Sequence, residues 1–156
     1  MKIKQIVVVS GYFDPIHVGH IEYIEKASKL GDHLIIIVNS DEQAYLKKGE
    51  SFMLEDDRLK IVQSLKWGDE VMICIDTDNS TCKTLELIRT KYPIDEIMIC
   101  NGGDRHIEEV PESKVAERLD MTMVDGLGEK IRSSSDLTGI KELKKTMKSL
   151  QSKFTK

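Results

Sequence analysis

The sequence predicts an α/β fold built on one five-stranded, doubly wound parallel sheet with helices on both faces. Apolar runs of strand length recur along the chain, and most of them are nearly continuous Val, Ile, Leu and Met. Strands have this composition when helices cover both faces of a parallel sheet. Amphipathic helical stretches lie between these runs. Right-handed crossovers between such units give a Rossmann-like arrangement, whose ligands bind beyond the carboxyl ends of the strands.

The predicted elements alternate between strand and helix. The connection over residues 39–54 is polar and longer than the usual about two to six residues, so we expect a functional loop there. We expect helices at residues 18–30, 55–66 and 80–92, each with apolar residues on one face. We expect strands at residues 5–10, 33–39, 70–75, 96–100 and 121–124.

The size and composition of the chain exclude several classes of protein. Its 156 residues suffice for one domain with a single core. No apolar run approaches about 18 residues, and no basic-then-apolar leader opens the sequence, so we expect a cytoplasmic protein without a membrane span. The formal net charge of -4 gives no general attraction to nucleic acid. We therefore expect no nucleic-acid partner.

The cysteines and two of the histidines receive no functional role. Cys74, Cys82 and Cys100 have no CxxC spacing, and the first and last of them lie in apolar runs. Thiols in such runs usually pack as small hydrophobic groups, so we expect neither a disulfide nor a zinc site. No role is assigned to His33 or His106.

Residues 11–20, GYFDPIHVGH, connect the first predicted strand to the first predicted helix. A helix N-terminus offers backbone N–H groups and the positive end of the helix dipole, which suit an anion such as phosphate. Gly11 lets the backbone approach such a ligand, and Gly19 leaves room for a nucleotide. His17 and His20 lie one turn apart on one helix face. For an isolated pair, the alternative is two helix-capping histidines beside an ordinary turn.

This stretch resembles the HxGH signature of the nucleotidylyltransferase superfamily, in particular its cytidylyltransferase-like family. That family includes glycerol-3-phosphate and choline-phosphate cytidylyltransferases and an adenylyltransferase domain that acts on heptose phosphate. The resemblance implies an enzyme that joins a nucleoside monophosphate from CTP to a small phosphorylated sugar or polyol and releases pyrophosphate. ATP and a heptose-type sugar phosphate are the alternative substrates. The matching residues are Gly11, Phe13, Asp14, His17, Gly19 and His20.

The resemblance also assigns roles to residues near the motif. It places Asp14 beside the triphosphate and possible Mg²⁺, whereas the residues alone indicate a turn formed by Asp14 and Pro15. Tyr12 stands where many family members have threonine or another small residue, so its contact with phosphate would differ here. The site lysine of the family matches Lys47, with Lys48 as the alternative, and would hold the phosphates of the two substrates.

Arg58, near the start of the helix predicted over residues 55–66, is a further candidate for the substrate site. The family has an arginine at such a place that points into the site. The alternative is a surface Arg58 that pairs with nearby acidic residues and contributes little to stability.

Two later segments resemble nucleotide-binding parts of the family. Residues 101–105, NGGDR, resemble the GGDR segment of the heptose-phosphate branch, and a plain Gly-Gly turn is the alternative. Residues 128–137, GEKIRSSSDL, are similar to the EKIxSSS form of that branch, although helix capping could explain one of the serines. The nucleotide-binding candidates are Gly11, Tyr12, Phe13, Asp14, Gly19, Gly103, Asp104, Arg105, Lys130, Ser133, Ser134 and Ser135.

The candidate residues predict direct transfer without a covalent enzyme intermediate, because no Ser, Cys or acid is placed as a nucleophile beside a base. Mg²⁺ would bridge the triphosphate, which is CTP or ATP. The predicted catalytic residues are His17, His20, Lys47 and Arg132, and the predicted substrate-binding residues are Lys47, Lys48 and Arg58.

Other nucleotide-binding classes fit the sequence less well. An NAD-binding redox domain would have GxGxxG after the first strand, and a P-loop NTPase would have GxxxxGK[ST]. Neither motif occurs in residues 11–20. A regulatory nucleotide-binding module without turnover is the alternative from another class.

We expect a nucleotidylyltransferase domain over residues 1–139 and an amphipathic helix over residues 140–156. Apolar residues recur in this helix at spacings of three and four, with lysines outside the apolar stripe. We expect the stripe to pack on its own domain or at a homodimer interface, and a membrane-surface helix is the third alternative.

Overall fold

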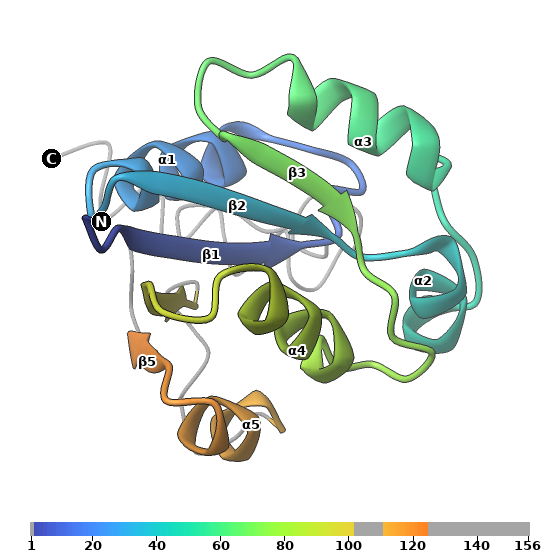
Figure 1. Ribbon diagram of the computed structural model, residues 1–156. Helices are drawn as coiled ribbons and strands as arrows, with labels where there is room; N and C mark the ends of the chain where they lie inside the picture. Colours follow the sequence, from blue (N-terminus) through green and yellow to red (C-terminus); the bar gives the residue numbers. More distant parts are fainter. Residues whose placement is uncertain (1, 102–110, 125–156) are drawn as a thin grey trace, which may run out of the picture.

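The computed structural model describes residues 2–101 and 111–124, which form a parallel sheet with helices on both faces (Figure 1). The five strands lie in the order β3-β2-β1-β4-β5, and each neighbouring pair is parallel. The predicted fold class is thereby confirmed. The strands are β1 (Gln5–Gly11), β2 (His33–Val38), β3 (Glu70–Ile73), β4 (Glu96–Cys100) and β5 (Thr122–Val124).

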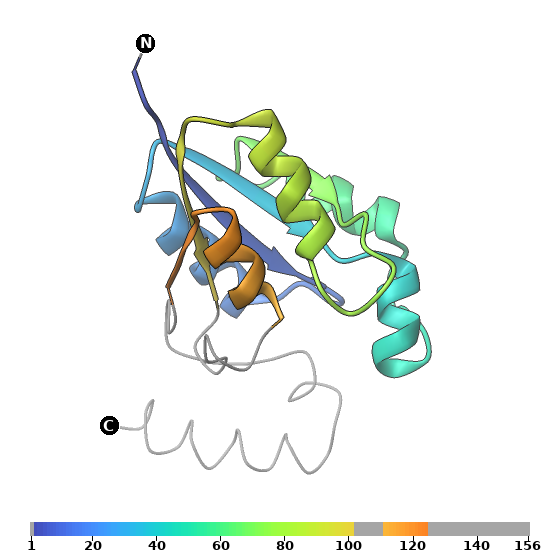
Figure 2. The ribbon, with the colours of Figure 1, turned by 60° about the horizontal axis from the view of Figure 1, so that its bottom comes forward.

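Five helices accompany the strands in the described residues: α1 (Val18–Ser28), α2 (Asp41–Lys48), α3 (Glu55–Gln63), α4 (Cys82–Lys91) and α5 (Glu112–Arg118). Buried side chains of α1 and α3 pack on one face of the sheet, and those of α4 and α5 pack on the other. Figure 2 shows the same two layers from a second direction. The helix α2 lies beyond the end of β2, beside the carboxyl edge of the sheet (Figure 1).

The central strand β1 is buried on both faces. Val7 and Val9 pack in the layer of α1 and α3, whereas Ile6 and Val8 pack in the layer of α4 and α5. All four side chains are at most 1% exposed. Successive side chains of a strand point to opposite faces, so both faces of β1 need apolar residues. This explains why its apolar run is continuous.

The order of the strands reverses beside β1. The chain passes from β1 to β2 and β3 on one side, and then places β4 and β5 on the other side. In sheets of this kind, ligands bind at the carboxyl ends of the strands where the order reverses. Gly11 is the last residue of β1, so the strand leads directly into the predicted motif at this edge.

The prediction of a loop over residues 39–54 was wrong, because this connection contains α2. The Ser40 hydroxyl accepts a hydrogen bond from the Gln43 N–H, and the Gln43 side chain accepts one from the Ser40 N–H. Gly49 ends the helix in the left-handed conformation, with φ of 87°. The polar composition pointed to a loop, although the capping pattern was present in the sequence. The helix α5 was likewise not predicted.

In the described part of the chain, no helix is both long and apolar enough to cross a membrane. The predicted boundary at residue 139 and the predicted helix over residues 140–156 lie outside the described residues. The packing of that helix, on its own domain or between two copies, stays a prediction.

Candidate active site

His17 and His20 lie at the start of α1, after the turn that follows β1. The Nδ1 atom of His17 accepts a hydrogen bond from the Gly19 N–H, and the Nδ1 atom of His20 accepts one from the His17 N–H, both at 3.1 Å. The two rings are stacked, with centroids 3.8 Å apart. The structure therefore brings the two histidines together, and it shows that they also cap the helix.

The capping bonds determine where the ring protons lie. A neutral imidazole has one donor and one acceptor nitrogen, so a ring that accepts at Nδ1 carries its proton on Nε2. Burial, together with the neighbouring His17, lowers the pKa of His20 to about 3. His20 is therefore neutral near pH 7, and its Nε2–H is a hydrogen-bond donor without a positive charge.

Phe13 holds this pair from the side of the core. It has a φ of 53°, and its side chain is 1% exposed. The ring meets His20 edge-on, with centroids 5.1 Å apart, and a Cβ atom on Gly11 would lie 2.8 Å from its Cζ atom. A side chain at Gly11 would therefore collide with the Phe13 ring, and the approach of the Gly11 backbone to a ligand stays a prediction. Phe13 supports the site from the core instead of lining it.

Asp14 joins the motif turn to the segment after α2. Its carboxylate is buried and accepts hydrogen bonds from the N–H groups of Phe52, at 2.8 Å, and Met53, at 2.6 Å. The Lys48 ammonium lies 2.9 Å from the Oδ2 atom. Burial by itself raises the pKa of Asp14, but the hydrogen bonds from Lys48, Phe52 and Met53 outweigh it and lower the pKa below its ordinary value. Asp14 is thus an ionised organiser of the turn.

Arg58 is fully buried beneath the same turn. Its Nη1 atom donates to the carbonyl groups of Tyr12, at 2.8 Å, and Asn39, at 2.6 Å. Its Nε atom donates to the Met53 carbonyl, and its Nη2 atom pairs with the Asp41 carboxylate. The side chain is 1% exposed. The surface alternative for Arg58 is wrong, and the geometry favours support of the site over direct contact with substrate.

The two candidate lysines lie in the last turn of α2, and their ammonium groups have different partners. Lys48 pairs with the Asp14 carboxylate and donates to the Asp14 carbonyl at 3.1 Å. The Nζ atom of Lys47 lies over the ring of Tyr12, 4.5 Å from its centroid. The structure thus brings both lysines to the motif turn. Their contact with substrate phosphates stays a prediction.

Gln43 is a supporting residue that sequence reasoning missed. Its side chain is fully buried and donates to the carbonyl groups of Asp78 and Ser80, each at 2.8 Å. The same side chain accepts from the Asn39 amide at 3.0 Å. Gln43 therefore ties α2 to the segment before α4. Its position three residues after Ser40 was the available signal, because serine and glutamine at this spacing form a capping box.

The chain matches the family model described as cytidylyltransferase-like over residues 8–135, more than half of its length. The chain belongs to the cytidylyltransferase-like family. Over 130 residues, this cytidylyltransferase-like chain is 38% identical to the bifunctional protein HldE of Geobacter metallireducens. The matched region covers 79% of this chain and 25% of that relative. Over 103 residues it is 36% identical to an FAD synthase of Ferroglobus placidus. That match covers 66% of this chain and 62% of the FAD synthase. The chain thus spans about a quarter of the HldE relatives.

The fold of this cytidylyltransferase-like chain is shared with solved structures. It is similar to the lipopolysaccharide core biosynthesis protein from Thermoplasma volcanium GSS1, with a TM-score of 0.61 and 22% identity. The likeness covers 81% of this chain and 98% of that chain. At this level of identity the likeness shows the fold. Nucleotidyl transfer, the predicted reaction class, is the reaction class of the family.

Several predicted nucleotide-binding residues of the cytidylyltransferase-like chain lie outside the described residues. The chain leaves β4 after Cys100 and β5 after Val124, both at the carboxyl edge that carries the motif turn. The Asn101 N–H donates to the Val124 carbonyl at 2.9 Å. The roles of the following residues stay predictions: Gly103, Asp104, Arg105, Lys130, Arg132, Ser133, Ser134 and Ser135.

The described residues do not provide a protein cage for Mg²⁺. Among residues 2–101 and 111–124, no group of three or more His, Cys, Asp or Glu side chains is arranged to hold a metal ion. Both carboxylate oxygens of Asp14 already accept hydrogen bonds from backbone N–H groups. Mg²⁺ is commonly held through one or two carboxylates together with substrate phosphates, and its binding here stays a prediction.

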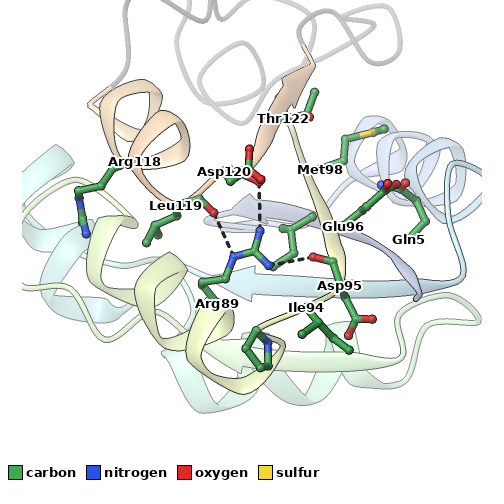
Figure 3. A pocket seen from close by; sticks show the side chains of 12 residues that line it. Gln5, Arg89, Ile94, Asp95, Glu96, Met98, Arg118, Leu119, Asp120 and Thr122 are labelled. Carbon is green, nitrogen blue, oxygen red and sulfur yellow. Dashed lines mark hydrogen bonds between the residues drawn. The ribbon is translucent and has the colours of Figure 1, made fainter. Parts of the chain in front are cut away.

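A pocket of about 650 Å³ lies at the amino-terminal ends of the strands, opposite the carboxyl edge that carries the motif turn (Figure 3). It is lined by the first residues of β1, β4 and β5, which are Gln5, Glu96 and Thr122. Arg89 projects into it, but its guanidinium donates to backbone carbonyl groups, including that of Asp95 at 2.8 Å. The arginine therefore holds chain segments together. The candidate active site is the motif turn at the carboxyl edge, not this pocket.

Proposed function

We propose that this chain transfers an adenylyl group from ATP to the phosphate of a small acceptor and releases pyrophosphate. One observation carries the proposal: two stacked histidines, His17 and the neutral His20, begin α1 where the order of the strands reverses. Helix N-termini at this place bind phosphate. The Nε2–H groups add two donors for phosphate oxygens at the same point.

The reaction consists of one displacement at phosphorus. An oxygen of the acceptor phosphate attacks the α-phosphorus of ATP, and the bond from that phosphorus to the bridging oxygen of pyrophosphate breaks. The electron pair of the broken bond leaves with pyrophosphate. His17 and His20 donate hydrogen bonds to oxygens that gain negative charge, and Lys47 adds a positive charge. Loss of one such donor typically raises the barrier by about 2.7 to 4 kcal/mol.

The relatives favour ATP over CTP, the triphosphate that the motif first suggested. FAD contains an adenylyl group, and the FAD synthase of Ferroglobus placidus is named for making it. The HldE relatives belong to the heptose-phosphate adenylyltransferases, the branch that the GGDR and EKIxSSS segments resemble. The proposed acceptor is a small phosphorylated sugar or polyol, and a flavin phosphate is the second acceptor to test. Mg²⁺ bound with ATP, a homodimer and a cytoplasmic location belong to the proposal.

The test is pyrophosphate release with Mg²⁺, each of the four nucleoside triphosphates, and a panel of sugar, polyol, choline and flavin phosphates. His17→Asn and His20→Asn are the matched variants, because asparagine offers an oxygen for the capping bond but no Nε2–H donor. His33→Asn, at the start of β2 and far from the motif, is the control.

We expect release that requires ATP and one acceptor, is lost by about two or more orders of magnitude in each motif variant, and is unchanged in the control. If pyrophosphate is released with CTP and not with ATP, the nucleotide donor is CTP. If ATP binds but no acceptor reacts, the regulatory nucleotide-binding module is the better description. Thermal unfolding of each variant shows whether the loss comes from chemistry or from stability.

A further inference from the structure

The carboxyl ends of β1 and β4 separate next to the motif turn. The two strands pair only as far as Val8 and Ile99. Beyond this point β1 continues along β2 as far as Gly11, whereas β4 continues along β5 as far as Cys100. In doubly wound sheets, the ligand binds outside the carboxyl ends of strands that part in this way. The ends of β1 and β4 are therefore the two sides of the expected ligand site.

Tyr23 links the helix that follows the motif turn to the end of β4. It lies one helical turn after His20 on the same face of α1. Its hydroxyl group donates a hydrogen bond to the Cys100 carbonyl group at 2.5 Å. That carbonyl lies beyond the last residue pair of β1 and β4. The bond therefore connects the two sides of the site where the sheet no longer connects them.

The ring of Tyr23 packs on the α1 side of the sheet, against a buried cluster that includes Val9, Phe13 and Cys100. These three side chains are at most 2% exposed. Apolar packing is not directional, whereas a hydrogen bond fixes both a distance and an angle. We propose that Tyr23 is a positioning residue, whose hydroxyl sets the separation between the motif helix and the end of β4 and thereby shapes the nucleotide site.

This inference rests on the proposed function for its ligand, a nucleoside triphosphate bound between the two strand ends. Tyr23→Phe is the informative variant, because it keeps the ring and removes only the hydroxyl group. Tyr92→Phe is the matched control. The Tyr92 hydroxyl also donates a hydrogen bond, to the Glu70 carboxylate, but Glu70 is the first residue of β3 and lies at the other edge of the sheet.

The first measurement is the affinity of the full chain for ATP and for CTP, each with Mg²⁺, by isothermal titration calorimetry. We expect Tyr23→Phe to weaken binding of the preferred triphosphate about 2- to 13-fold, the range for the net effect of one hydrogen bond. Tyr92→Phe should leave the affinity unchanged. With active enzyme, the positioning role predicts that Tyr23→Phe raises the KM for the triphosphate more than it lowers kcat.

The second measurement is amide hydrogen exchange at Asn101, followed by NMR without any ligand. The Asn101 N–H donates to the Val124 carbonyl group at 2.9 Å, so its exchange reports on the end of β4. We expect faster exchange at Asn101 in Tyr23→Phe and no change in Tyr92→Phe. Exchange at Ile36, in the buried strand β2, reports on global stability, and only an excess at Asn101 counts as a local effect.

The outcomes separate the inference from the proposed function. If the wild type binds a triphosphate and Tyr23→Phe binds it equally well, the inference is overturned and the proposed function stands. Equal losses of affinity in both tyrosine variants, or weaker binding without faster exchange at Asn101, would also overturn it. A wild type that binds neither triphosphate would overturn both. Weaker binding in Tyr23→Phe alone, with faster exchange at Asn101, supports the inference even if no acceptor reacts in the pyrophosphate-release assay.

Discussion

The backbone N–H of His17 donates a hydrogen bond to the Nδ1 atom of His20, 3.1 Å away. The bond closes the first turn of α1 and places the ring proton of His20 on Nε2. Because the acceptor belongs to a ring of lowered pKa, protonation of that ring breaks the cap. The stability of the turn and the protonation state of the site are therefore coupled through one side chain.

The free energy of unfolding should fall as the pH is lowered from 6.5, the ordinary pKa of histidine, towards the pKa of about 3 that His20 has in the fold. In this window the unfolded chain binds a proton that the folded His20 does not, so acid favours unfolding. The slope is at most about 1.4 kcal/mol per pH unit for one group. Urea titrations at several pH values measure it, and His20→Asn should flatten the curve. Equal slopes in both proteins would show that His20 is not the group.

Replacement of Asp14 by asparagine should destabilise the fold by about 2 to 4 kcal/mol, because hydrogen bonds to a buried charge are strong and Lys48 loses its ion partner. The carboxylate has two backbone donors, and asparagine can accept with one oxygen only. Urea unfolding gives the change. Lys48→Met removes only the half-exposed partner and should cost less. A larger loss in Lys48→Met would contradict this ranking.

Arg58→Lys should lower the free energy of unfolding by about 3 to 5 kcal/mol, although it preserves the charge. The guanidinium donates to four acceptors from its three nitrogen atoms, and a single ammonium group cannot reach all four. Lys60→Met, on the exposed side of the same helix, is the control and should change stability little. Chemical denaturation of both variants is the measurement. If Arg58→Lys leaves the free energy of unfolding nearly unchanged, the buried contacts of Arg58 do not hold the turn.

A methyl group at Gly11 should destabilise the protein by about 1 to 3 kcal/mol through a clash with the Phe13 ring. The added Cβ would lie 2.8 Å from the ring carbon Cζ. Phe13→Leu creates space at that point, so Gly11→Ala should cost less in the Phe13→Leu background than in the wild type. Differential scanning calorimetry of the four proteins measures the coupling. Additive losses would show that the clash is not with this ring.

The sequence by itself determined the sheet and the place of the motif. Continuous apolar runs such as residues 5–10 predicted buried parallel strands, because each strand needs apolar residues for two covered faces. The rule for ligand sites at carboxyl ends then placed the stretch from Gly11 to His20 at the functional edge. His17 and His20 could be paired in advance, since their spacing of three is a local property of a helix.

Only the tertiary structure decided which side chains support the site and which face it. Arg58 and Tyr12 are 46 residues apart, and Phe52 and Asp14 are 38 residues apart, yet each pair shares a hydrogen bond. No local pattern shows that a charged side chain will be buried by such contacts. The adjacent lysines 47 and 48 have the same chemistry in the sequence. They acquire different partners because the end of α2 meets a carboxylate and an aromatic ring on a turn that comes from another part of the chain.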